Sequence, residues 1–124
     1  MARILAVEDD AVSLRIVTKA LEYEGHEVVP HACAGDAITA LSDGPFDILV
    51  TDIMMPGEDG FSMIQAARRL RPGIKVIALS AIDERVPRDL TAQAFEKLGV
   101  DRVLGKPIKR ALLHDAVQAV LGGP

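Results

Sequence analysis

The feature that most constrains the fold is an apolar run that ends on an acid, in the segment Phe46–Pro56 (FDILVTDIMMP). Ile48, Leu49 and Val50 follow one another with no polar residue between them, which is typical of a strand buried on both faces of a parallel sheet. Asp52 then stands at the carboxyl end of that strand, where open α/β sheets bind their ligands. Asp is also common in turns and at helix caps, so the meaning of Asp52 depends on which other residues reach the same edge.

Similar apolar runs alternate with helix-like segments along the whole chain. The predicted strands are Arg3–Val7, Glu27–Pro30, Phe46–Thr51, Ile74–Leu79 and Arg102–Leu104. Apolar residues at helical spacing predict helices that include Ile16–Leu21, Ala37–Leu41, Phe61–Leu70, Leu90–Leu98 and Leu112–Leu121. This alternation predicts an α/β fold with a doubly wound, five-stranded parallel sheet.

The composition limits the class of protein. Because 49% of the 124 residues are hydrophobic, we expect one globular domain spanning residues 1–124. The net charge of −4, from 14 Lys and Arg against 18 Asp and Glu, favours neither nucleic-acid nor membrane binding. The single cysteine, Cys33, excludes an internal disulfide, and no apolar run resembles a signal peptide or a membrane span. We therefore expect a cytoplasmic protein.

Three arginines, Arg68, Arg69 and Arg71, lie at the end of the third predicted helix. The helix macrodipole favours cations at that end. We interpret the cluster as a solvated helix end, with a functional role as the alternative.

Acidic residues follow two of the predicted strands. Glu8, Asp9 and Asp10 come directly after the first strand, and Asp52 comes directly after the third. Because parallel strands end at the same edge of a sheet, we expect these carboxylates to lie close together. Crowded like charges raise one another's pKa unless a cation offsets them, and Mg²⁺ prefers a few carboxylates with water and phosphate oxygens. The sequence therefore predicts a magnesium site, with Asp10 serving in part as a cap of the first helix.

The same edge receives a hydroxyl and an ammonium. Ser80 follows the fourth strand and Lys106 follows the fifth. A hydroxyl can donate to a phosphoryl oxygen, and lysine pairs with phosphate as a point charge. Singly, Ser80 is more often a cap and Lys106 a surface charge, but the ends of four strands together indicate a phosphate-handling site.

Four motifs occur in order: Ile4–Asp10 (ILAVEDD), Asp47–Gly60 (DILVTDIMMPGEDG), Ser80-Ala81 and Lys106-Pro107. Together they resemble the signatures of the response-regulator receiver domains of two-component signalling, and the resemblance covers essentially the whole chain. It implies a flavodoxin-like (βα)5 fold with strand order 2-1-3-4-5. It also implies a regulator that catalyses only its own phosphorylation and dephosphorylation, and no DNA or membrane binding by this domain.

The resemblance also implies roles for the residues at the metal. Asp9 and Asp52 would bind Mg²⁺ directly. Glu8 would bind it through water, and Met54 through its backbone carbonyl.

For the phosphoryl group, the resemblance implies that Asp52 is the nucleophile. The donor would be a phosphohistidine of a histidine kinase or a histidine phosphotransfer protein. Lys106 would pair with the phosphoryl oxygens, and Ser80 would hydrogen-bond to them after Asp52 is modified.

The sequence departs from the family pattern in two places. Val103 stands where the family usually has Tyr or Phe, three residues before the lysine. The stretch from Ser80 to Lys106 is also longer than usual, with Ile82–Pro87 as the extra segment. Both departures concern the output surface, and we expect residues 82–90 to relay the signal in place of an aromatic side chain.

Other classes of protein fit the sequence less well. Aspartyl-phosphate phosphatases of the haloacid-dehalogenase type need a second Asp two residues after the nucleophile, where this chain has Met54. A dinucleotide-binding module needs a glycine-rich loop after the first strand. The remaining alternative is a receiver-like module that signals without phosphorylation, although such a module has no need of the acids, hydroxyl and lysine described above. The chain is either a stand-alone regulator or a piece of a longer protein.

Overall fold

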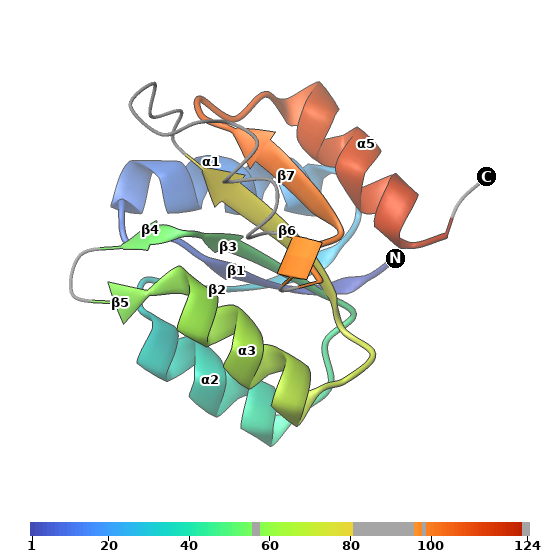
Figure 1. Ribbon diagram of the computed structural model, residues 1–124. Helices are drawn as coiled ribbons and strands as arrows, with labels where there is room; N and C mark the ends of the chain where they lie inside the picture. The colour runs from blue at the N-terminus through green and yellow to red at the C-terminus, as the bar shows by residue number, and fades with distance from the viewer. Residues whose placement is uncertain (56–57, 81–95, 98, 123–124) are drawn as a thin grey trace.

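A parallel five-stranded sheet lies between two layers of helices in the computed structural model (Figure 1). The structure describes residues 1–55, 58–80, 96–97 and 99–122, with the backbone alone for residues 54–55 and 58–61. The strands of this sheet are β1 (Arg3–Val7), β2 (Glu27–His31), β3 (Ile48–Asp52), β6 (Lys75–Ser80) and β7 (Arg102–Gly105). The described helices are α1 (Ala11–Tyr23), α2 (Ala34–Asp43), α3 (Gly60–Leu70) and α5 (Arg110–Val120).

The strand order is β2-β1-β3-β6-β7, and every neighbouring pair is parallel. Counted along the sheet, this is the predicted order 2-1-3-4-5, so the predicted fold class is confirmed. The fourth predicted helix, Leu90–Leu98, and the segment Ile82–Pro87 lie outside the described residues. None of the described helices has the length and apolar character needed to cross a membrane.

Four strands end one residue later than the sequence predicted. They end at His31, Asp52, Ser80 and Gly105, in place of Pro30, Thr51, Leu79 and Leu104. In β3, β6 and β7 the predicted strand ends at the last residue typical of a strand, whereas strand pairing continues through the backbone of the next residue, as in Asp52↔Leu79 and Ser80↔Gly105. Asp52 and Ser80 are therefore held by the sheet and are not loop residues.

A short antiparallel ladder follows β3 and was not predicted. It consists of β4 (Met54–Met55) and β5 (Glu58–Asp59), with Met54 opposite Asp59. Pro56 and Gly57, which separate these two strands in the sequence, lie outside the described part of the chain. The ladder places Met54 in a strand that begins two residues after Asp52.

The sheet separates two hydrophobic cores. Helices α2 and α3 cover one face of the sheet, and α1 and α5 cover the other (Figure 1). Side chains alternate along β1, so Leu5 packs toward α2 and α3 while Ile4 packs toward α1 and α5. In β3, Leu49 belongs to the first core and Val50 to the second, and both are fully buried. Burial on both faces accounts for the uninterrupted apolar runs of the sequence.

The arginine cluster at the end of α3 differs from the prediction of a solvated helix end. Arg69 is exposed, but Arg68 and Arg71 are half-buried. Arg71 Nε donates to the Leu41 carbonyl at 2.9 Å, and Arg68 donates to the Gly99 carbonyl. Two of the three guanidinium groups therefore tie α3 to other parts of the fold.

Candidate functional site

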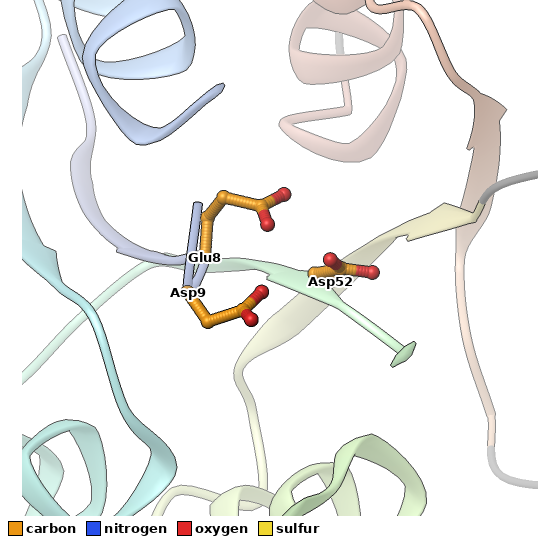
Figure 2. Close-up of side chains that lie close together, drawn as sticks. All are labelled: Glu8, Asp9 and Asp52. Atoms are coloured by element: carbon orange, nitrogen blue, oxygen red, sulfur yellow. The ribbon is translucent and has the colours of Figure 1, made fainter. Parts of the chain in front are cut away.

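Three carboxylates gather at the carboxyl edge of the sheet (Figure 2). Glu8 and Asp9 follow β1, and Asp52 is the last residue of the neighbouring strand β3. One oxygen from each carboxylate lies within 4.8 Å of the other two. Glu8 and Asp52 are buried, with exposed fractions of 1% and 3%, whereas Asp9 is exposed. The predicted acidic cluster is thus present in the fold.

Lys106 reaches this cluster from the end of β7. Its ammonium lies 2.7 Å from Glu8 Oε2 and 2.8 Å from Asp52 Oδ2, and it donates a hydrogen bond to Asp52. The Lys106 backbone N–H donates to the Ser80 carbonyl at 3.0 Å, which continues the pairing of β6 with β7. Ser80, half-buried at the end of β6, therefore shares the edge with the lysine.

Burial and neighbouring charges set the protonation of the site. Burial raises the pKa of Glu8 to about 7, and the adjacent Asp52 carboxylate adds to the rise, while Lys106 opposes it. Burial alone would lower the pKa of Lys106, but its hydrogen bonds to Asp52 and Glu8 raise it above the ordinary lysine value. Lys106 is therefore a cation at neutral pH and partly neutralises the two buried acids.

Asp10 faces the helix and not the cluster. Its carboxylate accepts from the backbone N–H groups of Val12 and Ser13 at 3.4 and 3.3 Å, and from the Ser13 hydroxyl at 2.7 Å. Asp10 is the N-cap of α1, as the sequence predicted in part. The three consecutive acids after β1 thus divide between the site and the helix.

The donor set fits a hard divalent cation. Glu8, Asp9 and Asp52 supply carboxylate oxygens, the ligands that Mg²⁺ prefers, and Asp9 keeps the cluster open to water. The backbone of Met54, at the start of β4, follows Asp52 by two residues. With the lysine ammonium beside Asp52, the arrangement can neutralise an incoming anion such as a phosphoryl group.

Comparison with known proteins identifies the family. The sequence model of the response regulator receiver domain matches residues 4–118, so the chain belongs to this family of two-component signalling domains. Its relatives include the protein PilH of Pseudomonas aeruginosa, 32% identical over 99% of this chain and 100% of that protein. Another is the receiver protein CpdR of Brucella abortus, 30% identical over 98% of each chain.

Other matches differ in how much of the matched protein this chain covers. The regulator NtrC of Azospirillum brasilense is 31% identical over 97% of this chain, but the chain spans only 24% of that protein. Among solved structures, a CheY-like receiver domain of Methanospirillum hungatei superposes with a TM-score of 0.87 at 28% identity, over 98% of this chain and 94% of that one. CheY4 of Vibrio cholerae superposes with a TM-score of 0.86 at 25% identity, over 97% of this chain and 98% of that one. These likenesses support the receiver fold and phosphorylation-dependent response regulation.

Proposed function

We propose that Asp52 accepts a phosphoryl group from a phosphohistidine of a histidine kinase or histidine phosphotransfer protein. The modified chain, acting as one receiver domain over residues 1–124, then changes its contact surface for a downstream protein. The observation that carries this proposal is the Lys106 ammonium, 2.8 Å from Asp52 Oδ2 and 2.7 Å from Glu8 Oε2. A cation held against a buried carboxylate at a ligand-binding sheet edge suits an anionic reactant.

The transfer step needs little beyond positioning and charge neutralisation. An Asp52 oxygen attacks phosphorus, the P–N bond to the histidine breaks, and its electron pair goes to the imidazole, which takes a proton from solvent. The product is an acyl phosphate on Asp52. Lys106 exchanges its contact with the carboxylate for one with the phosphoryl oxygens, and the Ser80 hydroxyl donates to another of these oxygens.

A divalent cation completes the proposal. Asp9 and Asp52 would hold Mg²⁺ directly, Glu8 through water and Met54 through its backbone carbonyl. When bound, Mg²⁺ supplies positive charge beside the phosphoryl oxygens. The raised pKa of Glu8 supports a cation here, since burial and a second carboxylate disfavour its charged form in the absence of one.

Intact mass measurement after treatment with acetyl phosphate tests the assignment. With Mg²⁺ the mass should rise by one phosphoryl group, and chelation of Mg²⁺ should prevent the rise. Asp52→Asn should abolish it. Asp10→Asn is the matched control, since Asn caps a helix as well as Asp and the variant should still be labelled. Labelling that persists in Asp52→Asn would contradict the proposal.

A further inference from the structure

The position of Lys106 depends on a short strand. β7 has four residues, lies at one end of the five-stranded sheet and pairs with β6 from Ile77↔Arg102 to Ser80↔Gly105. Lys106 follows it directly. A slip of one residue in this pairing would displace the lysine by about 3.3 Å. The two contacts of 2.7 and 2.8 Å at the acidic cluster therefore require a fixed register.

Asp101 fixes the register just before β7 begins. Its backbone N–H donates to the Val76 carbonyl at 2.9 Å, and its Oδ2 accepts from the Val76 backbone N–H at 2.8 Å. Asp101 thus hydrogen-bonds to both the N–H and the carbonyl of Val76 in β6. The side chain of Asp101 does here what the backbone does within the sheet.

Arg68 holds this junction from α3. Its Nη2 lies 3.3 Å from Asp101 Oδ2, and the same nitrogen donates to the Gly99 carbonyl. Gly99 has a φ of +73°, and a Cβ there would lie 3.5 Å from Arg68 Nη2, so glycine provides the backbone turn against which the guanidinium packs. Arg68 therefore contacts two residues of the segment that leads into β7.

The energetic value of the Arg68–Asp101 pair for folding is small. The two side chains are 29% and 30% exposed, and partly solvated ion pairs contribute little to stability. The pair is weak, but its geometry is specific, because the planar guanidinium of Arg68 contacts a carbonyl and a carboxylate together. This favours a role in placing the segment over a role in holding the fold together.

We propose that Arg68 is a positioning residue for phosphorylation. Through Gly99 and Asp101 it fixes the start of β7, and through β7 it places the Lys106 ammonium between Glu8 and Asp52. The inference rests on the function proposed for Asp52 and Lys106. It gives one of the three arginines at the end of α3 a specific role, which the sequence left open.

Arg71 provides a matched control in the same helix end. It is half-buried and donates to a carbonyl, as Arg68 does, but its acceptor is Leu41 of α2 and not the segment before β7. We would compare Arg68→Gln with Arg71→Gln. The labelling rate is measured as a function of acetyl phosphate concentration at saturating Mg²⁺. Urea titration first establishes that each variant is fully folded under the assay conditions.

Arg68→Gln should lower the maximal labelling rate about tenfold, because small displacements of a catalytic group have effects of this order or larger. The half-saturating concentration of acetyl phosphate should stay unchanged. Arg71→Gln should stay within about twofold of the wild type. If Arg68→Gln does not fold, Asp101→Asn replaces it, since the amide oxygen can still accept from Val76 N–H while the charge that attracts Arg68 is lost. Equal maximal rates for the variant and the wild type, or equal losses in Arg68→Gln and Arg71→Gln, would overturn the inference.

A second readout separates this inference from the proposed function. The Lys106 backbone N–H, bonded to the Ser80 carbonyl, reports the end of β7 in an NMR spectrum without any phosphoryl donor. Its resonance should shift in Arg68→Gln and not in Arg71→Gln. A wild-type protein that is never labelled would refute the proposed function alone, whereas an unmoved Lys106 resonance in Arg68→Gln would refute the positioning role.

Discussion

The ammonium of Lys106 lies 2.8 Å from Asp52 Oδ2, and the same nitrogen lies 2.7 Å from Glu8 Oε2. Two carboxylates with exposed fractions of 3% and 1% therefore share one cation. Removing one partner of such a group leaves buried charge without compensation, which costs more than the net value of the contact.

We expect Lys106→Ala to destabilise the Mg²⁺-free protein by about 1–3 kcal/mol, because Glu8 and Asp52 lose their common partner. Urea unfolding measures this loss, and Mg²⁺ should restore part of it by supplying another positive charge. Lys109→Ala, which removes an exposed lysine three residues on, is the control and should change stability little. Equal stability of the two variants would show that the shared contact has no energetic role.

The neighbouring acids Asp9 and Asp10 should behave differently toward Mg²⁺. Asp9→Asn removes one carboxylate of the acidic cluster and should weaken Mg²⁺ binding about tenfold to hundredfold, the effect of a lost charge-assisted interaction. Asp10→Asn keeps the helix cap and should leave the affinity within about twofold. Isothermal titration of both variants with MgCl2 makes the comparison. A larger effect at Asp10 would exclude Asp9 as the ligand.

Protonation of His26 should contribute a loss of stability in mild acid. Its Nδ1 accepts from the Ala2 backbone N–H at 3.0 Å, and the imidazole is 8% exposed. Burial lowers the pKa of His26, and the positive N-terminus and His114 lower it further, against the opposing charge of Glu24. Because the unfolded chain binds a proton near pH 6.5 and the folded chain only below that, stability is lost as the pH falls from about 6.5 toward the folded pKa.

His26→Gln isolates this effect, since glutamine offers an acceptor but does not titrate. Glu8 acts in the opposite direction, because its pKa near 7 in the folded state means that stability falls as the pH rises from 4.5 to 7. That contribution is common to both proteins and cancels in the comparison. Urea unfolding at pH 7.5 and 5.5 should therefore show that acidification lowers the stability of the wild type relative to that of His26→Gln, and an equal change in the two proteins would contradict the role of the imidazole.

The output of the signal should not pass through position 103. Val103 is 43% exposed at the edge of the sheet, and its short β-branched side chain cannot exchange an outward rotamer for a buried one as a large aromatic can. We expect activation to alter residues 82–90, which lie outside the described part of the chain. Hydrogen exchange with and without beryllofluoride and Mg²⁺ measures this. Changes confined to Val103 and α5 would refute it.

The sheet and the acidic cluster could be predicted because they follow from strand direction. Once Glu8, Asp9 and Asp52 are assigned to the ends of parallel strands, the topology brings them to one edge whatever the loops do. Strand ends were less accurate, because Asp52 and Ser80 are polar and the sequence signal stops where side-chain apolarity stops.

The contacts of Arg68 could not be predicted in the same way. The three arginines lie within four consecutive positions at a helix end, and the helix macrodipole favours a cation at each of these positions to a similar degree. The local sequence therefore does not distinguish them. Which of them is drawn inward depends on the reach of each side chain to Gly99 or Leu41, a property of the packed molecule. Asp101 likewise gives no signal in sequence, since its role depends on the Val76 backbone beside it.

The separation of the two cores by the sheet has a consequence for how the protein tolerates change. Leu41 of α2 and Val117 of α5 are both fully buried, but they belong to cores on opposite sides of the strands. Because the two positions belong to separate cores, the free-energy costs of substitutions at them should add with little epistasis. The α1–α5 layer can therefore diverge in evolution, and acquire new binding specificity, without compensating changes in the α2–α3 layer.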